Sequence, residues 1–267
     1  MKLRELLYFV RKPAPRSFEG VPEPRALGKY GAATIAQWTH PRAQPLRLTE
    51  RMIDEMRQFV RDGDFAIDVG AHCGDSTLPI AFAAGASGAV VALEPNRFIF
   101  PVLAQNAALN RALTNIAPYP LAALDCAREV EFEYGDPDFM NGGEAVAASR
   151  FRPKFRQKVQ GANLAHLLAE KHASRLASLA FVKTDVEGHD LVVLETIRPL
   201  LEIHRPVVKS EVFSHLSPES RRAQYAFFAD LGYRVHRYGG DESMLGERID
   251  VTGMASAHGF DVLCVPR

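Results

Sequence analysis

Two acidic residues and two glycines in the N-terminal half of the chain have a spacing that could bind a ligand. The stretch DVGAHCGDST begins at Asp68 and carries Gly70 and Gly74 directly after an apolar run. Glycine turns let backbone amides approach a ligand closely, although the two glycines alone fit a simple tight turn equally well. Glu94 follows the next apolar run, twenty residues after Gly74, where a carboxylate can accept both hydroxyls of a ribose. Together these residues predict a site for a nucleotide-like cofactor.

The positions of the glycines separate two kinds of cofactor. A dinucleotide fingerprint requires glycines at its first, third and sixth positions, whereas this turn has Gly70, then His72, then Ser or Thr around the sixth. S-adenosylmethionine instead carries a carboxylate and an ammonium group, which the amides from Gly74 to Thr77 and the Asp68 carboxylate can receive. We therefore favour S-adenosylmethionine, with a nicotinamide-dependent Rossmann oxidoreductase as the alternative. The residues expected at the cofactor are Asp68, Gly70, Ala71, His72, Gly74, Asp75, Thr77, Glu94 and Pro95.

A second set of polar residues could carry out a reaction. Asp185, Glu187 and His189 follow one apolar run, and Glu211 lies near the end of the next. Transfer of a methyl group to a hydroxyl is an in-line displacement at carbon, so an enzyme must align the groups and help remove the hydroxyl proton. A carboxylate or a histidine can accept that proton, which makes these four residues the catalytic candidates, with Asp185 first. A helix-capping role for Glu187 is nearly as well supported.

The elements that must position these residues alternate between strands and helices. Apolar runs typical of strands lie at 65–69, 89–93, 180–185, 206–212, 233–237 and 260–265. Helical spacing covers 49–63, with Thr49 as N-cap, and a further helix is expected from Asn163. This alternation predicts an α/β fold with a Rossmann-like, doubly wound, mostly parallel sheet of seven strands. Ligands bind such sheets at the carboxyl ends of the strands, where both sets of residues fall.

Two parts of the chain do not follow this alternation. Residues 1–48 carry many prolines and little periodicity, which predicts an irregular N-terminal arm or cap ahead of one main domain at 49–267. From about residue 125 to residue 178 we expect an insertion before the fourth strand, with a hairpin edge at 129–134 and a loop at 136–143. We expect the arm and the loop to close over the acceptor, because alignment and desolvation need a cover that the sheet lacks.

The motifs resemble those of the FkbM family of methyltransferases. The family's usual turn, D-V-G-A-N-x-G followed by Ser or Thr, is matched closely by residues 68–77. The resemblance continues through 94–110, 182–189 and 210–212, and it spans roughly residues 50–265. It implies a fold of the class I methyltransferase type, S-adenosylmethionine as methyl donor, and O-methylation of a sugar, a glycan, a polyketide-derived scaffold or a related secondary metabolite.

Three positions depart from the family pattern. His72 replaces the usual Asn, which keeps a hydrogen-bond donor but adds bulk and a titratable ring at the methionine end of the cofactor. Asp190 stands where Glu is common and shortens that carboxylate by one methylene. Residues 163–165, Asn-Leu-Ala, replace Thr-Leu-Asp, and Asn163 can still cap the helix that follows. We interpret this last change as structural.

Composition limits the classes of partner. The 267 residues include 32 basic and 32 acidic side chains, so the chain has no basic field with which to bind nucleic acid. Three widely spaced cysteines predict neither a disulfide framework nor a metal site. The first ten residues are too polar for a secretory signal, and the uncharged stretch 78–93 is too short and broken to span a bilayer. We expect a cytoplasmic protein that methylates a small-molecule hydroxyl and has no nucleic-acid or membrane partner.

Two further interpretations stay open at this stage. Asp185, Glu187 and Glu211 carry oxygen atoms of the kind that magnesium prefers, but their spacing is not diagnostic, and we favour a site without a metal. A catalytically silent binding module is the other interpretation. Acidic residues at the ends of three strands argue against it, because a fold retained only as a scaffold has no chemical need of them.

Overall fold

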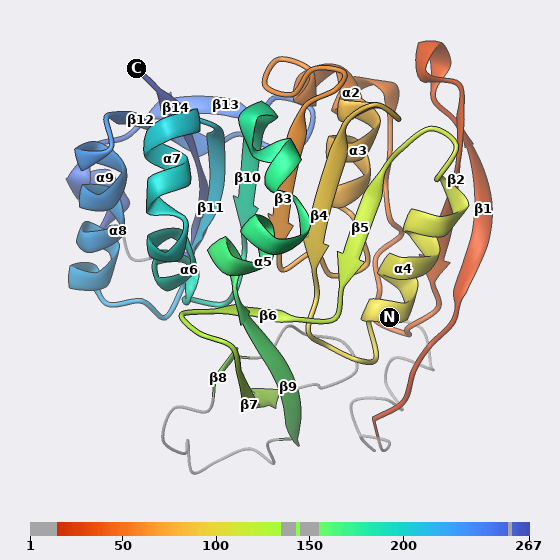
Figure 1. Ribbon diagram of the computed structural model, residues 1–267, viewed down its shortest axis with the longest axis horizontal. Helices are drawn as coiled ribbons and strands as arrows, with labels where there is room; N and C mark the ends of the chain where they lie inside the picture. The colour runs from red at the N-terminus through yellow and green to blue at the C-terminus, as the bar shows by residue number, and fades with distance from the viewer. Residues whose placement is uncertain (1–14, 135–142, 145–154, 256–257) are drawn as a thin grey trace.

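The core of the molecule is a single twisted sheet with helices on both faces (Figure 1). The computed structural model describes residues 15–134, 143–144, 155–255 and 258–267. In these residues the sheet has eight strands in the order β13-β12-β14-β11-β10-β3-β4-β5. In that order the strands are Leu245–Arg248, Tyr233–Tyr238, Phe260–Pro266, Val207–Val212, Leu179–Thr184, Phe65–Val69, Ala89–Leu93 and Ile116–Tyr119. The strands from β11 to β5 are all parallel, and β14 runs antiparallel to β11 and β12.

The α/β architecture and the mostly parallel sheet agree with the prediction, and the strand count differs by one. The additional strand β13 pairs antiparallel with β12 at the edge of the sheet. Its sequence, LGER, is short and mostly exposed, so it lacks the apolar run that marks the buried strands. A search for runs of buried apolar residues does not predict a polar edge strand of this kind.

Alternate residues of the strands pack against two helical layers. On one face Ala66 and Phe181 join a core with the helices α2, α3 and α4. On the other face Ile67 and Val182 join a core with the helices α5 to α9. The helices are α2 (Glu50–Met56), α3 (Thr77–Ala84), α4 (Phe100–Leu109), α5 (Leu164–Lys171), α6 (Asp190–Thr196), α7 (Arg198–His204), α8 (Pro218–Asp230) and α9 (Val251–Met254). Because both faces are covered, every residue of β3 and β4 is buried. In the described part of the chain, no helix is both long and apolar enough to cross a membrane.

Both predicted helix starts are confirmed. Thr49 caps α2, where its hydroxyl accepts a hydrogen bond from the Met52 amide at 3.2 Å. Asn163 caps α5 in the same way, with 3.0 Å from its side-chain oxygen to the His166 amide. The predicted helix over 49–63 is too long, since α2 ends at Met56 and turns follow it.

The sequence predicts an irregular arm at residues 1–48, but the described part of this region contains regular structure. The strands β1 (Gly20–Ala26) and β2 (Ala32–Trp38) form an antiparallel hairpin around the short 3-10 helix η1 (Gly28–Tyr30). Pro22 and Pro24 lie in β1, an exposed strand that pairs with β2 alone among the described strands. Edge strands tolerate proline because the missing amide costs no ladder bond there, so the prolines did not mark irregular structure.

Two asparagines of α4 bind the free edge of β2 to the domain. The Asn106 side-chain oxygen accepts a hydrogen bond from the Ala36 amide at 2.7 Å, and its nitrogen donates to the Cys73 carbonyl at 2.9 Å. Asn110 bonds both backbone groups of Thr34, at 3.0 and 2.9 Å. The side-chain amides therefore take the place of a neighbouring strand. Their spacing of four residues on one helix face brings both to the same edge.

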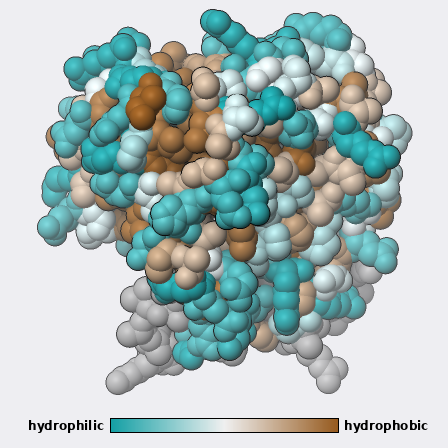
Figure 2. All heavy atoms as spheres, in the orientation of Figure 1, coloured by the Kyte–Doolittle hydropathy of each residue, from teal (hydrophilic) through white to brown (hydrophobic). Residues whose placement is uncertain are grey.

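The insertion before the fourth parallel strand of the core, β10, forms a second sheet (Figure 1). Its strands are β6 (Ala122–Leu124), β7 (Arg128–Tyr134), β8 (Gly143–Glu144) and β9 (Phe155–Asn163), followed after α5 by the 3-10 helix η2 (Ala173–Ser178). The sheet lies below the carboxyl ends of β3, β4 and β5, and the exposed side of β9 is largely hydrophilic (Figure 2). The predicted hairpin edge at 129–134 is β7. The predicted loop 136–143 lies almost wholly outside the described residues.

The hydrogen bonds of Asn106 make a testable contribution to stability. Asn106→Ala leaves the buried Ala36 amide and Cys73 carbonyl without partners, so we expect a loss of about 1–3 kcal/mol in the free energy of unfolding. Urea unfolding followed by circular dichroism measures it. Asn115→Ala is the matched control, because Asn115 is exposed and its change should stay within about 0.5 kcal/mol. Equal effects of the two substitutions would contradict the proposed role of Asn106.

Candidate active site

The site forms where the strand order of the core changes direction. The strand β3 has β4 on one side and β10 on the other. The loops that follow β3 and β10 therefore lie next to each other at the carboxyl ends of these two strands. A β-carbon on Gly70 would overlap the carbonyl oxygen of Asp185. Glycine at position 70 therefore lets the turn after β3 pack directly against the end of β10. This contact joins the two predicted sets of site residues.

The turn after β3 has an unusual backbone. Gly70, His72 and Gly74 have φ values of 78°, 47° and 96°, a region that favours glycine. The amides of Gly70 and Ala71 donate to the Leu93 carbonyl at 3.0 and 2.9 Å, and the Gly74 amide donates to the Ala71 carbonyl at 2.8 Å. His72 replaces an asparagine of the family pattern, and asparagine adopts this conformation more readily than most side chains. The turn is thus held by the end of β4.

Asp68 lies beneath the turn, and the ligand-binding role that the sequence predicts for its carboxylate stays a prediction. The side chain is completely buried, and one oxygen accepts hydrogen bonds from the Ser76 hydroxyl at 2.8 Å and the Thr77 hydroxyl at 2.6 Å. The other oxygen lies 3.4 Å from the Lys183 ammonium. Asp68 and Thr77 therefore hold the turn against the sheet, and a ligand ammonium would reach the Asp68 carboxylate only after neighbouring groups uncovered it.

Lys183 is a site residue that the sequence reasoning did not select. It lies beside Asp68 in the register of β10 and β3, and its side chain is 4% exposed. Burial alone would lower its pKa, but the charges of Asp68 and Asp185 outweigh burial and hold the pKa above its usual value. A single lysine inside an otherwise apolar strand, two positions before Asp185, is the signal that could have identified it.

Glu94 lies at the end of β4 as predicted, and it is completely buried. One carboxylate oxygen accepts a hydrogen bond from the His72 amide at 2.9 Å, and the other from the Asn96 amide at 2.7 Å. Burial raises its pKa. Glu94 therefore braces the turn through His72, and its contact with a ribose remains a prediction. Pro95 follows it, half-buried, and ends the strand.

The second sheet adds Tyr134 to this part of the site. Tyr134 is 1% exposed, and its hydroxyl has no hydrogen-bond partner in the described part of the chain. Burial, followed by the nearby Glu94 carboxylate, raises the pKa of its phenol. The sequence pattern predicted a hairpin edge at 129–134 but gave no sign that its last residue approaches Glu94.

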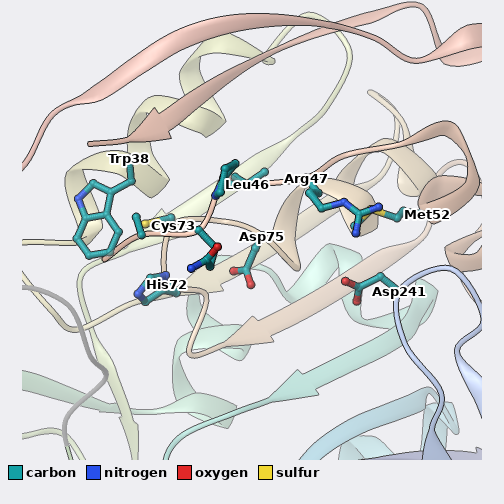
Figure 3. A pocket seen from close by; sticks show the side chains of 11 residues that line it. Trp38, Leu46, Arg47, Met52, His72, Cys73, Asp75 and Asp241 are labelled. Carbon is teal, nitrogen blue, oxygen red and sulfur yellow. The ribbon is translucent and has the colours of Figure 1, made fainter. Parts of the chain in front are cut away.

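A cavity of about 350 Å³ opens beside the turn (Figure 3). Its walls come from the segment that follows β2, from the turn residues His72 to Asp75, and from Asp241. Trp38 packs edge-on against the His72 ring, with 5.3 Å between the ring centroids, and Asp75 is exposed. Figure 3 shows Asp75 between these rings and Asp241. Trp38 and the segment after β2 thus line the cavity, and the sequence did not identify Trp38 or Asp241 as lining residues.

Carboxylates crowd the ends of β10 and β11. Burial, with Asp185 and Asp190 nearby, raises the pKa of Glu187 to about 7. Burial also raises the pKa of Asp190, a residue left out of the predicted site, to about 6. The pKa of Glu211 is raised furthest of the three, to about 9, by burial and by the charges of Asp185, Asp190 and Glu187. Such crowding favours proton sharing among these groups.

The remaining catalytic candidates lie at the same edge. Asp185 is 39% exposed, and its carboxylate is 3.5 Å from Lys183. Glu187 has a φ of 55°, and His189 is half-buried directly before α6 without capping that helix through its side chain. No group of three or more His, Cys, Asp or Glu side chains in the described ranges has an arrangement that could hold a metal ion.

Burial makes Cys73 an unsuitable nucleophile. It lines the cavity, and burial followed by the charges of Asp75 and Glu94 raises the pKa of its thiol. A thiol, and not the reactive thiolate, is therefore the form present near neutral pH. This leaves the carboxylates and His189 as the groups that can move a proton at the site.

The strand order, the glycine turn at the switch point and the acidic residue after the next strand define a Rossmann-like α/β protein. The model of the methyltransferase FkbM domain family matches residues 68–235. The chain belongs to this family. The match includes the turn, Glu94, the end of β10 and Glu211. It does not include the hairpin β1–β2.

Two solved structures with low sequence identity are similar to the chain. A methyltransferase FkbM from Methylobacillus flagellatus KT is 14% identical with a TM-score of 0.50, and the match covers 77% of this chain and 44% of that one. The chain thus spans less than half the length of that relative. A SAM-dependent O-methyltransferase from Thermotoga maritima is 11% identical with a TM-score of 0.39, over 84% of this chain and 68% of the other. No curated protein matches the chain.

The raised pKa of Glu211 predicts a pH dependence of stability. The folded protein keeps the Glu211 proton to about pH 9, while the ordinary value is 4.5. The folded state therefore binds more protons between these values, and stability falls as the pH rises through this window. Glu211→Gln removes this titration, so the variant should lose less stability than the wild type between about pH 5 and pH 8, by on the order of 1 kcal/mol after allowance for exposure.

Chemical denaturation at both pH values measures this difference. Glu219→Gln is the matched control, since Glu219 is exposed in the first turn of α8 and should leave the wild-type pH dependence unchanged. A Glu211→Gln variant that keeps the wild-type slope would show that the crowding of carboxylates around Glu211 has no energetic effect.

Proposed function

We propose that the chain is an S-adenosylmethionine-dependent O-methyltransferase that acts on a hydroxyl of a small molecule such as a sugar, a glycan or a secondary metabolite. The observation that carries the proposal is the meeting of three features at one edge of the sheet. These are the glycine turn of the FkbM family, the cavity beside it, and the carboxylate of Asp185. The turn can hold a cofactor, the cavity can admit it, and the carboxylate can accept a proton.

The residues around the turn fit the charged groups of the cofactor. Asp75 is exposed at the cavity wall and can receive an ammonium group more readily than the buried Asp68. Each Glu94 oxygen accepts one backbone amide and has capacity for a second hydrogen bond, as ribose binding requires. Neighbouring side chains must first uncover Glu94, because it is 0% exposed. When bound, S-adenosylmethionine supplies an electrophilic methyl group on a sulfonium centre.

Asp185 is the best placed residue to accept the proton of the acceptor hydroxyl. It follows β10 at the ligand-binding edge, and its side chain is 39% exposed, whereas that of Asp68 is fully buried. Glu211, with its raised pKa, is protonated near neutral pH and can donate a hydrogen bond to an acceptor oxygen. One carboxylate that accepts and one that donates would orient a hydroxyl-bearing acceptor.

The two other interpretations have less support. A nicotinamide-dependent oxidoreductase is disfavoured by membership of a methyltransferase family and by the glycine spacing. A silent binding module does not account for the partly buried carboxylates with raised pKa values. Burying a carboxylate costs free energy, and a protein that serves only as a scaffold gains nothing from it.

The first test is cofactor binding. Isothermal titration calorimetry should detect S-adenosylmethionine and its demethylated product, and neither NAD nor NADP. Glu94→Ala should weaken S-adenosylmethionine by about 1.5–3 kcal/mol, because two ribose hydroxyls lose a charged acceptor and the His72 amide loses its brace. Glu219→Ala, on exposed α8, should bind normally. Tight NAD binding without S-adenosylmethionine binding would overturn the proposed function.

The second test concerns Asp185. Asp185→Asn should reduce turnover by about 10²- to 10⁴-fold while cofactor affinity changes little, since neutral Asn cannot accept the hydroxyl proton. The acceptor is first found by incubating the enzyme with methyl-labelled S-adenosylmethionine and a metabolite extract, and identifying the labelled product. Near-normal turnover of a folded Asp185→Asn variant would move the proton acceptor to Glu187, His189 or Glu211.

A further inference from the structure

A buried lysine lies between the two halves of the site. The Lys183 ammonium donates a hydrogen bond to the Gly70 carbonyl at 2.6 Å, and it lies 3.4 Å from Asp68 and 3.5 Å from Asp185. Its side chain is 4% exposed. Removing an ammonium group from water costs several kcal/mol unless charges and hydrogen bonds compensate. An apolar residue would fill this position in the strand without that cost, so packing alone does not explain a lysine here.

The position of Lys183 is fixed from three directions. The register of the sheet places it beside Asp68 on β3 and beside Lys209 on β11. The Gly70 carbonyl belongs to the turn that packs against the end of β10. Lys209 does not share the role, since its ammonium pairs with Asp261 at 3.1 Å. Among the described residues, the ion pair of Asp185 is with Lys183.

The other charged groups along this edge of the sheet are mostly acidic, and Glu187, Asp190 and Glu211 interact with Asp185 directly. The charged groups along the edge are Asp68 and Asp75 around the turn, Glu187, His189 and Asp190 before and at the start of α6, Lys209 and Glu211 on β11, and Asp261 on β14. Nearby carboxylates favour protonation of a carboxyl group, and a nearby ammonium favours its ionised form. Without Lys183, the acidic neighbours would therefore act on Asp185 unopposed.

We propose that Lys183 is a positioning residue for the reaction, which holds the Asp185 carboxylate ionised and in place beside the cofactor turn. The proposal rests on the proposed function of Asp185 as proton acceptor. Lys183 itself contacts no reacting atom, because its three partners are protein groups and it is buried. The sequence links the two residues directly, since they are two positions apart and leave β10 together.

The test is the titration of Asp185 followed by ¹³C NMR of its side-chain carboxyl. In Lys183→Met the midpoint should move to higher pH by at least about one unit relative to the wild type, a tenfold change in proton affinity. Lys183→Arg keeps the positive charge, so its midpoint should stay closer to that of the wild type. A purely structural role for Lys183 predicts no such difference between two folded variants.

A second variant protects the test against misfolding. Lys183→Met alone leaves Asp68 buried without its ion pair, whereas the double substitution Asp68→Asn with Lys183→Met removes both charges. The control for the double variant is Asp68→Asn alone, which keeps the lysine. The titration midpoint of Asp185 should lie at higher pH in the double variant than in this control. An Asp185 midpoint that does not rise in folded Lys183→Met, or in the double variant against its single control, overturns the proposal.

This experiment is independent of the proposed function. The titration needs neither cofactor nor acceptor, while calorimetry with S-adenosylhomocysteine on the wild type tests cofactor binding alone. A raised midpoint in a protein that does not bind S-adenosylhomocysteine would keep the coupling of Lys183 and Asp185 and reject the methyltransferase. Binding with an unmoved midpoint would reject the role of Lys183 and leave the methyltransferase intact.

Discussion

The close approach of two backbone segments at Gly70 is the constraint on which the site depends. A side chain at this position would overlap the Asp185 carbonyl, so glycine alone lets the turn after β3 meet the end of β10. The Asp185 amide donates to the Val69 carbonyl at 3.1 Å, which extends the parallel pairing of the two strands to this point. The segment proposed to hold the cofactor and the segment that carries the reactive carboxylate therefore form one rigid unit.

The charges at this edge follow from that contact. Asp68, Lys183 and Asp185 alternate in sign across the junction, and one Asp68 oxygen accepts hydrogen bonds from the hydroxyls of Ser76 and Thr77. Further along the edge, Glu187 and Glu211 are partly buried among like charges, which favours their protonated forms. An acid-rich edge attracts cations, and a sulfonium cofactor carries a positive charge where its demethylated product does not.

The apolar pattern predicted the central strands closely, because buried parallel strands leave little freedom in composition: β3 and β4 have the expected bounds. The pattern did not predict the hairpin β1–β2, in which the outer edge of β2 forms hydrogen bonds with asparagine side chains instead of another strand.

For the site, spacing along the chain located Glu94 and Asp185 at strand ends. It could not show that Asp68 is enclosed, or that Lys183 lies beside it, since both facts depend on register between strands that are far apart in sequence.

The central claim is that a methyl donor binds at the turn and reaches the end of β10. The most direct measurement is a titration of ¹⁵N-labelled protein with S-adenosylhomocysteine, followed by the chemical shifts of assigned backbone amides. The account predicts saturable shifts concentrated in residues 70–77, in Glu94 and in Asp185. Shifts that leave these residues unmoved, or no saturable shifts at millimolar ligand, would contradict it.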